Sequence, residues 1–174
     1  MELRPYQNEA VSAIFNQWNS GFKNTLLVLP TGTGKTVVFS KVVEEEVKDG
    51  SKALILAHRG ELLDQASDKL KVASGLDSAL EKAESTSIGS PLDVTVASVQ
   101  TLSQEKRLAR FPRDYFKTIV VDEAHHSMSE TYQRILKHFD AARVLGVTAT
   151  PDRADQKNLG QFFNSKAYEY SMHQ

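Results

Sequence analysis

Short apolar runs alternate with amphipathic helical patterns along almost the whole chain, and this alternation constrains the fold more than any other feature. The runs predicted as strands are 25–29, 53–57, 94–99, 118–121 and 143–148, with shorter ones near Ala79 and at 166–170. The main runs are continuously apolar, as expected of strands that are buried on both faces. Because strands alternate with helices, the sequence predicts a single α/β domain over residues 1–174. Its mainly parallel β-sheet is flanked by helices on both faces.

The helical patterns lie between these runs. The first follows Pro5 and ends at Gly21, and others begin near Lys35 and Leu62 and around Tyr132. An acidic run at residues 44–46 falls within the second pattern and is predicted to be its solvated face.

Composition excludes several classes of protein. Lys and Arg total 21 against 22 Asp and Glu, so overall charge gives no support for a nucleic-acid binder, and any such site must be a local patch. The chain has no cysteine, which excludes disulfides and thiolate metal sites. No apolar run approaches the roughly 20 residues of a membrane span, and the N-terminus lacks the pattern of a signal peptide. A cytoplasmic protein without a membrane partner is predicted.

A loop suited to phosphate binding follows the first predicted strand. Residues 30–36 read Pro-Thr-Gly-Thr-Gly-Lys-Thr. Glycines let the backbone curl so that its N–H groups point inward, and the following helix adds the positive end of its dipole. Lys35 can reach the β and γ phosphates, and the Thr36 hydroxyl can bind Mg²⁺. The alternative is an ordinary glycine-rich turn, because Leu29 stands where the strict pattern has glycine.

Two adjacent acids follow the strand at 118–121. The Asp122 carboxylate, beside the phosphate loop, is predicted to hold Mg²⁺, and Glu123 to orient and deprotonate a water molecule. The alternative for Asp122 is a helix N-cap. Paired with the upstream loop, the acids predict a site that splits ATP with Mg²⁺ as its metal cofactor.

The histidines after the acids invite a metal-site interpretation. Adjacent histidines on one segment cannot easily face a single ion, so we favour a polar link between His125 and the turn at 148–150.

These segments together resemble a known family. Residues 122–125, Asp-Glu-Ala-His, resemble the signature of DEAH-box proteins of helicase superfamily 2, and residues 30–36 resemble motif I. The segments at 4–7, 57–65, 98–102 and 148–153 resemble, in order, the adenine-recognition motif and motifs Ia, Ib and III. The amino-acid sequences of these segments most resemble those of type III restriction motor subunits and RadD-like or UvrB-like repair helicases.

The resemblance implies a RecA-like P-loop domain and assigns roles within it. The residues implied in nucleotide binding are Arg4, Gln7, Thr31, Gly32, Thr33, Gly34, Lys35 and Thr36. Of these, Arg4 and Gln7 recognise adenine, although both could simply flank the first helix. Lys35, Asp122 and Glu123 form the catalytic set, with Thr36 and Asp122 on Mg²⁺.

The resemblance also implies contacts with nucleic acid, DNA rather than RNA. The residues implied in these contacts are His58, Arg59, Gln65, Ser98, Gln100 and Thr101. They follow strands and open helices, where free N–H groups can bind backbone phosphates. The alternatives are a solvated Arg59 and a routine helix cap at 98–101. A basic stretch at 106–113 either borders the strand path or is a solvated helix face. His125, Thr148 and Thr150 are implied to couple nucleotide state to strand binding.

The predicted function is therefore ATP hydrolysis by the first motor domain of a helicase or translocase. The second domain, which carries the arginine fingers in this family, is not in these 174 residues, so weak turnover is expected of the isolated domain. The rival interpretation is a nucleotide-switched binding module that does not unwind nucleic acid. A P-loop kinase is a weaker third, because no acceptor-binding lid is evident.

Overall fold

The computed structural model describes residues 3–30, 34–58, 63–81, 86–126, 129–149 and 151–169. The elements follow in the order α1 (Pro5–Asn19), β1 (Asn24–Val28), α2 (Lys35–Glu46), β2 (Ala53–Ala57), α3 (Leu63–Ser74), β3 (Ser78–Glu81), β4 (Val94–Ser98), α4 (Val99–Leu102), α5 (Glu105–Leu108), β5 (Thr118–Asp122), η2 (Ala124–His126), α6 (Glu130–His138), β6 (Arg143–Thr148), α7 (Arg153–Phe162) and β7 (Ser165–Glu169). The predicted strands and the four main helices are confirmed. In the described ranges, no helix is long and apolar enough to cross a membrane.

Within the described residues, seven strands form one sheet in the order β3-β4-β2-β5-β6-β1-β7. Every neighbouring pair is parallel. All strands therefore end at the same edge of the sheet, which is where ligands of such folds bind. Because β1 and β5 are the two neighbours of β6, the phosphate loop and the acidic pair lie one strand apart.

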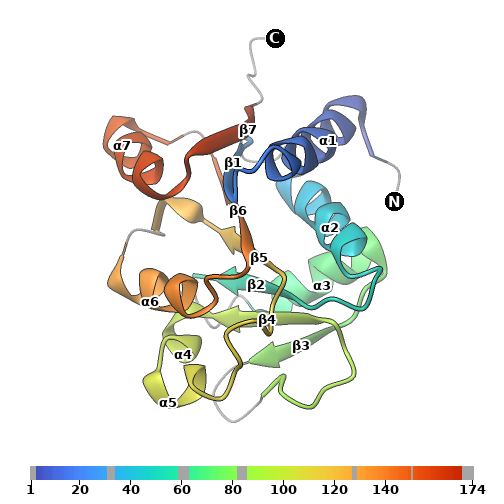
Figure 1. Ribbon diagram of the computed structural model, residues 1–174. Coiled ribbons are helices and arrows are strands. Elements are labelled where there is room, and N and C mark those ends of the chain that lie inside the picture. The colour runs from blue at the N-terminus through green and yellow to red at the C-terminus, as the bar shows by residue number, and fades with distance from the viewer. Residues whose placement is uncertain are drawn as a thin grey trace.

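Helices cover both faces of the sheet, as Figure 1 shows, with α1, α2 and α3 on one face and α4, α5, α6 and α7 on the other. Alternate residues of each strand supply two separate cores. Leu27 and Ile55 pack with the first group of helices. Leu26 and Leu54 pack with the second group. Burial on both faces is the physical reason why these strands are continuously apolar in sequence.

The acidic run in α2 departs from its predicted role. Glu46 is only 3% exposed and its carboxylate is 2.5 Å from the Arg143 guanidinium and 3.1 Å from Lys117 Nζ. The prediction of a solvated face is therefore wrong for this residue. Glu46 lies three and four residues after the buried Val43 and Val42, so the helical repeat turns it toward the core.

The C-terminal part of the fold contains a helix that the sequence patterns did not reveal. In α7 only Leu159 is buried, so it lacks the apolar stripe by which helices are recognised. After α7, Phe163 packs against Gly146 of β6, where an added Cβ atom would meet the Phe163 ring at 2.4 Å.

Candidate nucleotide and nucleic-acid site

The end of the phosphate loop opens directly into helix α2. Gly34 has φ +79°, a left-handed conformation that suits glycine, and Lys35 is the first helical residue. A Cβ atom at position 34 would lie 2.5 Å from Gln7 Nε2, so conformation and space both call for glycine. Leu29, which replaces the glycine of the strict pattern, is fully buried, and its N–H donates to Thr148 O at 3.0 Å. Thr31, Gly32 and Thr33 lie outside the described residues.

The acidic pair stands on a strained turn. Asp122 is the last residue of β5, and Glu123 has φ +56°, the only positive φ of a non-glycine residue in the described part of the chain. Such a conformation costs roughly 1–3 kcal/mol and is concentrated at functional sites. The Glu123 N–H donates to Asp122 Oδ1 at 2.9 Å, so the aspartate holds the turn. Since Asp122 ends a strand and η2 begins only at Ala124, Asp122 is not the N-cap of that helix.

Lys35 brings the two motifs together. Its Nζ is 3.5 Å from Asp122 Oδ1 and 3.3 Å from Glu123 Oε1. The three side chains are 23%, 30% and 42% exposed, so the cluster is open to solvent on one side. Surface-accessible ion pairs are weak, and a phosphate group can therefore compete for the lysine. An ammonium, two carboxylates and the adjacent Thr36 are a donor set that fits Mg²⁺ and a triphosphate.

The two residues predicted at the adenine lie at the start of α1. Gln7 is 5% exposed, and its Oε1 accepts from the Arg4 N–H at 2.9 Å. Its Nε2 faces Gly34, as the close approach above requires. Gln7 thus helps to cap the start of α1, which agrees with the alternative that it flanks the first helix. Its side chain also contacts the phosphate loop at Gly34.

The residues predicted to contact nucleic acid follow β2 and β4. His58 comes directly after β2, and its Nδ1 is 3.3 Å from the Tyr132 hydroxyl. Ser98 is the N-cap of α4 and its Oγ accepts from the Thr101 N–H at 3.2 Å, so the predicted cap is present. Gln100 on α4 and Gln65 on α3 are exposed. Arg59 lies outside the described residues.

The predicted link from His125 is confirmed. Its Nδ1 is 3.2 Å from Thr148 Oγ1 at the end of β6 and 3.7 Å from Glu123 Oε2. The DEAH segment is therefore tied to the segment resembling motif III. Thr150 lies outside the described residues.

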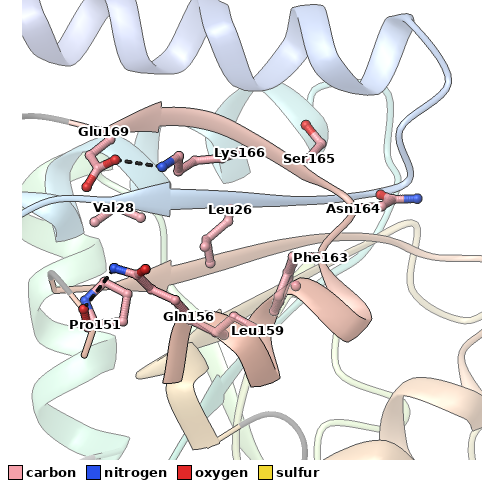
Figure 2. Close-up of a pocket in the computed structure, with 11 residues that line it drawn as sticks. Leu26, Val28, Pro151, Gln156, Leu159, Phe163, Asn164, Ser165, Lys166 and Glu169 are labelled. Carbon is pink, nitrogen blue, oxygen red and sulfur yellow. Dashed lines mark hydrogen bonds and ion pairs between the residues drawn. The ribbon is translucent and has the colours of Figure 1, made fainter. Parts of the chain in front are cut away.

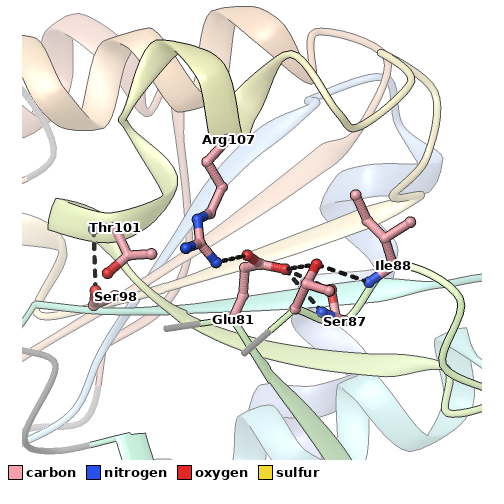
Figure 3. A network of polar contacts seen from close by, with 7 residues as sticks. Glu81, Ser87, Ile88, Ser98, Thr101 and Arg107 are labelled. Carbon is pink, nitrogen blue, oxygen red and sulfur yellow. Dashed lines mark hydrogen bonds and ion pairs between the residues drawn. The ribbon is translucent and has the colours of Figure 1, made fainter. Parts of the chain in front are cut away.

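Part of the basic stretch serves the fold rather than the surface. Figure 3 shows Arg107 of α5 on the carboxylate of Glu81, a fully buried residue at the end of β3. The same carboxylate accepts from Thr86 Oγ1 at 2.7 Å and from the Ser87 N–H at 2.8 Å. This network joins β3, at the edge of the sheet, to α5.

A separate cavity of about 420 Å³ lies between α7 and strands β1 and β7 (Figure 2). Leu26, Leu159 and Phe163 give it an apolar side, and Lys166 and Glu169 form an ion pair at 2.7 Å along β7. None of the predicted site residues lines this cavity, so we assign it no part in the nucleotide site.

Comparison with known proteins decides the family. Residues 1–153 match the family model described as "Type III restriction enzyme, res subunit". The chain belongs to this family. It is the N-terminal motor domain of a superfamily 2 helicase, as the resemblance predicted.

Curated relatives agree with this assignment. The putative ATP-dependent helicase IRC3 of Saccharomyces cerevisiae is 37% identical over 95% of this chain. The DNA 3'-5' translocase XPB2 of Sulfurisphaera tokodaii is 32% identical over 91% of it. The chain spans only 26% and 33% of those two proteins, respectively.

Solved structures show the same fold. The helicase domain of Pyrococcus furiosus Hef superposes with a TM-score of 0.74 at 24% identity, covering 93% of this chain and 36% of that one. The SWI2/SNF2 ATPase core of Sulfolobus solfataricus, solved with dsDNA, gives 0.71 at 23% identity, covering 94% and 36%. The predicted RecA-like domain is thereby confirmed.

Two residues that contact His58 are not singled out by the sequence. The apolar spacing predicts Tyr132 only as a core residue of α6, and the adjacent pair of histidines suggests His126 only as a metal ligand. Their rings lie beside His58, as described below. A signal existed only for Tyr132, whose hydroxyl needs a polar partner when the ring is buried.

Proposed function

We propose that this domain binds ATP with Mg²⁺ and hydrolyses it as the first motor domain of a helicase or translocase that acts on DNA. The observation that carries the proposal is the meeting of Lys35 with Asp122 and Glu123 at the carboxyl edge of the sheet. Family membership supports ATP-dependent helicase or translocase activity.

Each residue has a role that its position allows. Lys35 binds the β and γ phosphates, and Thr36 and Asp122 hold the Mg²⁺, which when bound neutralises charge on the transferred phosphoryl group. Glu123, which stands on the strained turn directly after Asp122, orients and deprotonates the attacking water. Gln7 and Arg4 bind adenine beside the loop.

The proposed contacts with nucleic acid lie near the ends of β2 and β4. There His58, Gln100 and Thr101, together with Arg59 and Gln65, contact backbone phosphates, which position a strand without reading its sequence. Ser98 contributes through the cap that sets α4. DNA is preferred to RNA because named relatives include a DNA translocase and a core solved with dsDNA.

A second RecA-like domain completes the motor in the full-length protein. Support comes from the greater length of the relatives, of which this chain covers about a quarter to a third. A cytoplasmic location stays a prediction, and one relative is named as mitochondrial.

The deciding experiment is ATP turnover by the full-length protein alone and with single-stranded DNA, duplex DNA or RNA. Strong stimulation by a DNA polymer is the expected result. Stimulation by RNA alone would change the substrate class. Equally low turnover under all four conditions would overturn the proposal of a motor and favour a nucleotide-switched binding module. Robust turnover by residues 1–174 alone would contradict the need for a second domain.

A further inference from the structure

Two histidines from distant parts of the sequence stack face to face. The rings of His58, after β2, and His126, at the end of η2, have centroids 3.8 Å apart and planes within 8° of each other. One ring belongs to the segment proposed to bind nucleic acid. The other ends the short helix that follows Glu123. Such a stack fixes the distance between the two segments.

Tyr132 holds the stack from one side. Its hydroxyl is 3.3 Å from His58 Nδ1, and its ring lies nearly parallel to His58 at 6.3 Å. Burial raises the pKa of the Tyr132 phenol, so the hydroxyl keeps its proton and can pair with either tautomer of His58. The orientation of the His58 ring is thus set by a residue of the core.

On its other side, the stack approaches the strained turn that carries Glu123. The ring of His126 is 4.2 Å from that of His125. His125 Nδ1 lies 3.7 Å from Glu123 Oε2 and 3.2 Å from Thr148 Oγ1. A continuous series of ring and polar contacts therefore joins His58 to Glu123.

The stack also faces a cavity of about 810 Å³ beside the strand-binding segments. His58, His125 and His126 line it together with Gln100 of α4. Burial lowers the pKa of His126, and the neighbouring His125 and His58 act in the same direction, against Glu123 and Asp155. The His126 ring is consequently neutral near pH 7.

We propose that His126 is a positioning residue that couples nucleic-acid binding after β2 to the placement of Glu123 after β5. The inference rests on the proposed function. A phosphate bound at His58 shifts its ring, and the stacked ring of His126 transmits the shift to η2. Because η2 begins at the residue after Glu123, its movement turns the Glu123 carboxylate toward the water that it activates.

The test uses the full-length protein with His126→Ala and His126→Phe. Basal ATP turnover, turnover at saturating nucleic acid, the Kd for that polymer and Tm are measured for each. We expect His126→Ala to lower the stimulation by about 2- to 10-fold, the range for loss of one ring pair, while basal turnover and Kd stay nearly constant. Phenylalanine keeps a flat ring and should restore most of the stimulation. The matched control is His138→Ala. His138 lies on α6, and its Nε2 is hydrogen-bonded to Phe111 O.

A double-mutant cycle separates coupling from simple destabilisation. His58→Ala weakens polymer binding as well, but its effect on stimulation at saturation should not add to that of His126→Ala. Equal losses of basal and stimulated turnover, additive effects, or unchanged stimulation in His126→Ala would each overturn the inference. If no polymer stimulates the wild-type protein, the proposed function fails first and the coupling falls with it.

Discussion

The two ends of the sheet hold charged clusters of opposite character. At the carboxyl end, Lys35, Asp122 and Glu123 are partly exposed and stand on a strained turn. At the amino end, Glu46 is buried between Arg143 and Lys117, and the Arg143 guanidinium lies 4.4 Å from the centroid of the Trp18 ring. The ion pairs at the carboxyl end, called the open end below, can exchange partners with a ligand. The ion pairs at the amino end, called the closed end, cannot exchange partners in this way, and they hold α1, α2 and β6 together.

The largest expected effect is on activity, at the open end. Lys35→Ala removes the ammonium that contacts both acids and should lower ATP turnover of the full-length protein by at least about 100-fold, as loss of a transition-state donor does. The fold should persist, because the lysine is not buried. Steady-state ATPase and a thermal melt measure the two quantities. Retained turnover would refute the assignment of the loop.

The largest expected effect on stability is at the closed end. Glu46→Gln removes the charge that Arg143 and Lys117 share and should cost about 1.5–3 kcal/mol of unfolding free energy, the usual loss for hydrogen bonds to a charged group, because both cations keep contact with solvent. Denaturant unfolding measures it. Glu45→Gln is the matched control on the same helix, because Glu45 pairs only at the surface with Lys41 and Lys48. Similar losses in both variants would break the comparison.

A smaller loss is expected where α7 meets the sheet. Gly146→Ala would place its Cβ atom 2.4 Å from the Phe163 ring and should cost about 1–3 kcal/mol through overpacking. Gly160→Ala, in α7, has nothing within 4 Å of the added atom and serves as the control. Denaturant unfolding of both variants separates crowding from the general effect of replacing glycine, and equal stability would show that Phe163 yields freely.

The smallest effect is a pH dependence from His126. Its pKa in the folded protein lies below its ordinary value of 6.5 because of burial and its histidine neighbours. Below pH 6.5 the unfolded state therefore binds more protons, and stability falls as pH decreases until the folded-state pKa is passed. Unfolding of wild type and His126→Phe at several pH values isolates this contribution. Parallel curves would show that His126 does not titrate differently on folding.

The sequence predicted the parts of the fold that obey simple periodicity. The run 53–57 matches β2, and 143–148 matches β6, because strands buried on both faces must be apolar throughout. Helix α7 was missed because its single buried residue leaves no stripe to detect. Glu46 was misplaced because three consecutive acids look alike, whereas the helical repeat distinguishes them.

The candidate site divides in the same way. Lys35, Asp122 and Glu123 could be brought together on paper because parallel strands end at one edge. The stack of His58 on His126 could not, because it depends on ring orientations across 68 residues that no spacing rule encodes. The buried partner of Arg107 was hidden for the same reason.

The most direct test of the central claim compares ATP affinity and ATP turnover in Glu123→Gln of the full-length protein. Glutamine keeps the size of the side chain but cannot take a proton from water. We expect ATP binding to be retained and turnover to fall by about 10²- to 10⁴-fold, the contribution of a general base. Normal turnover with normal binding would show that Glu123 does not activate the water and would contradict the proposed mechanism.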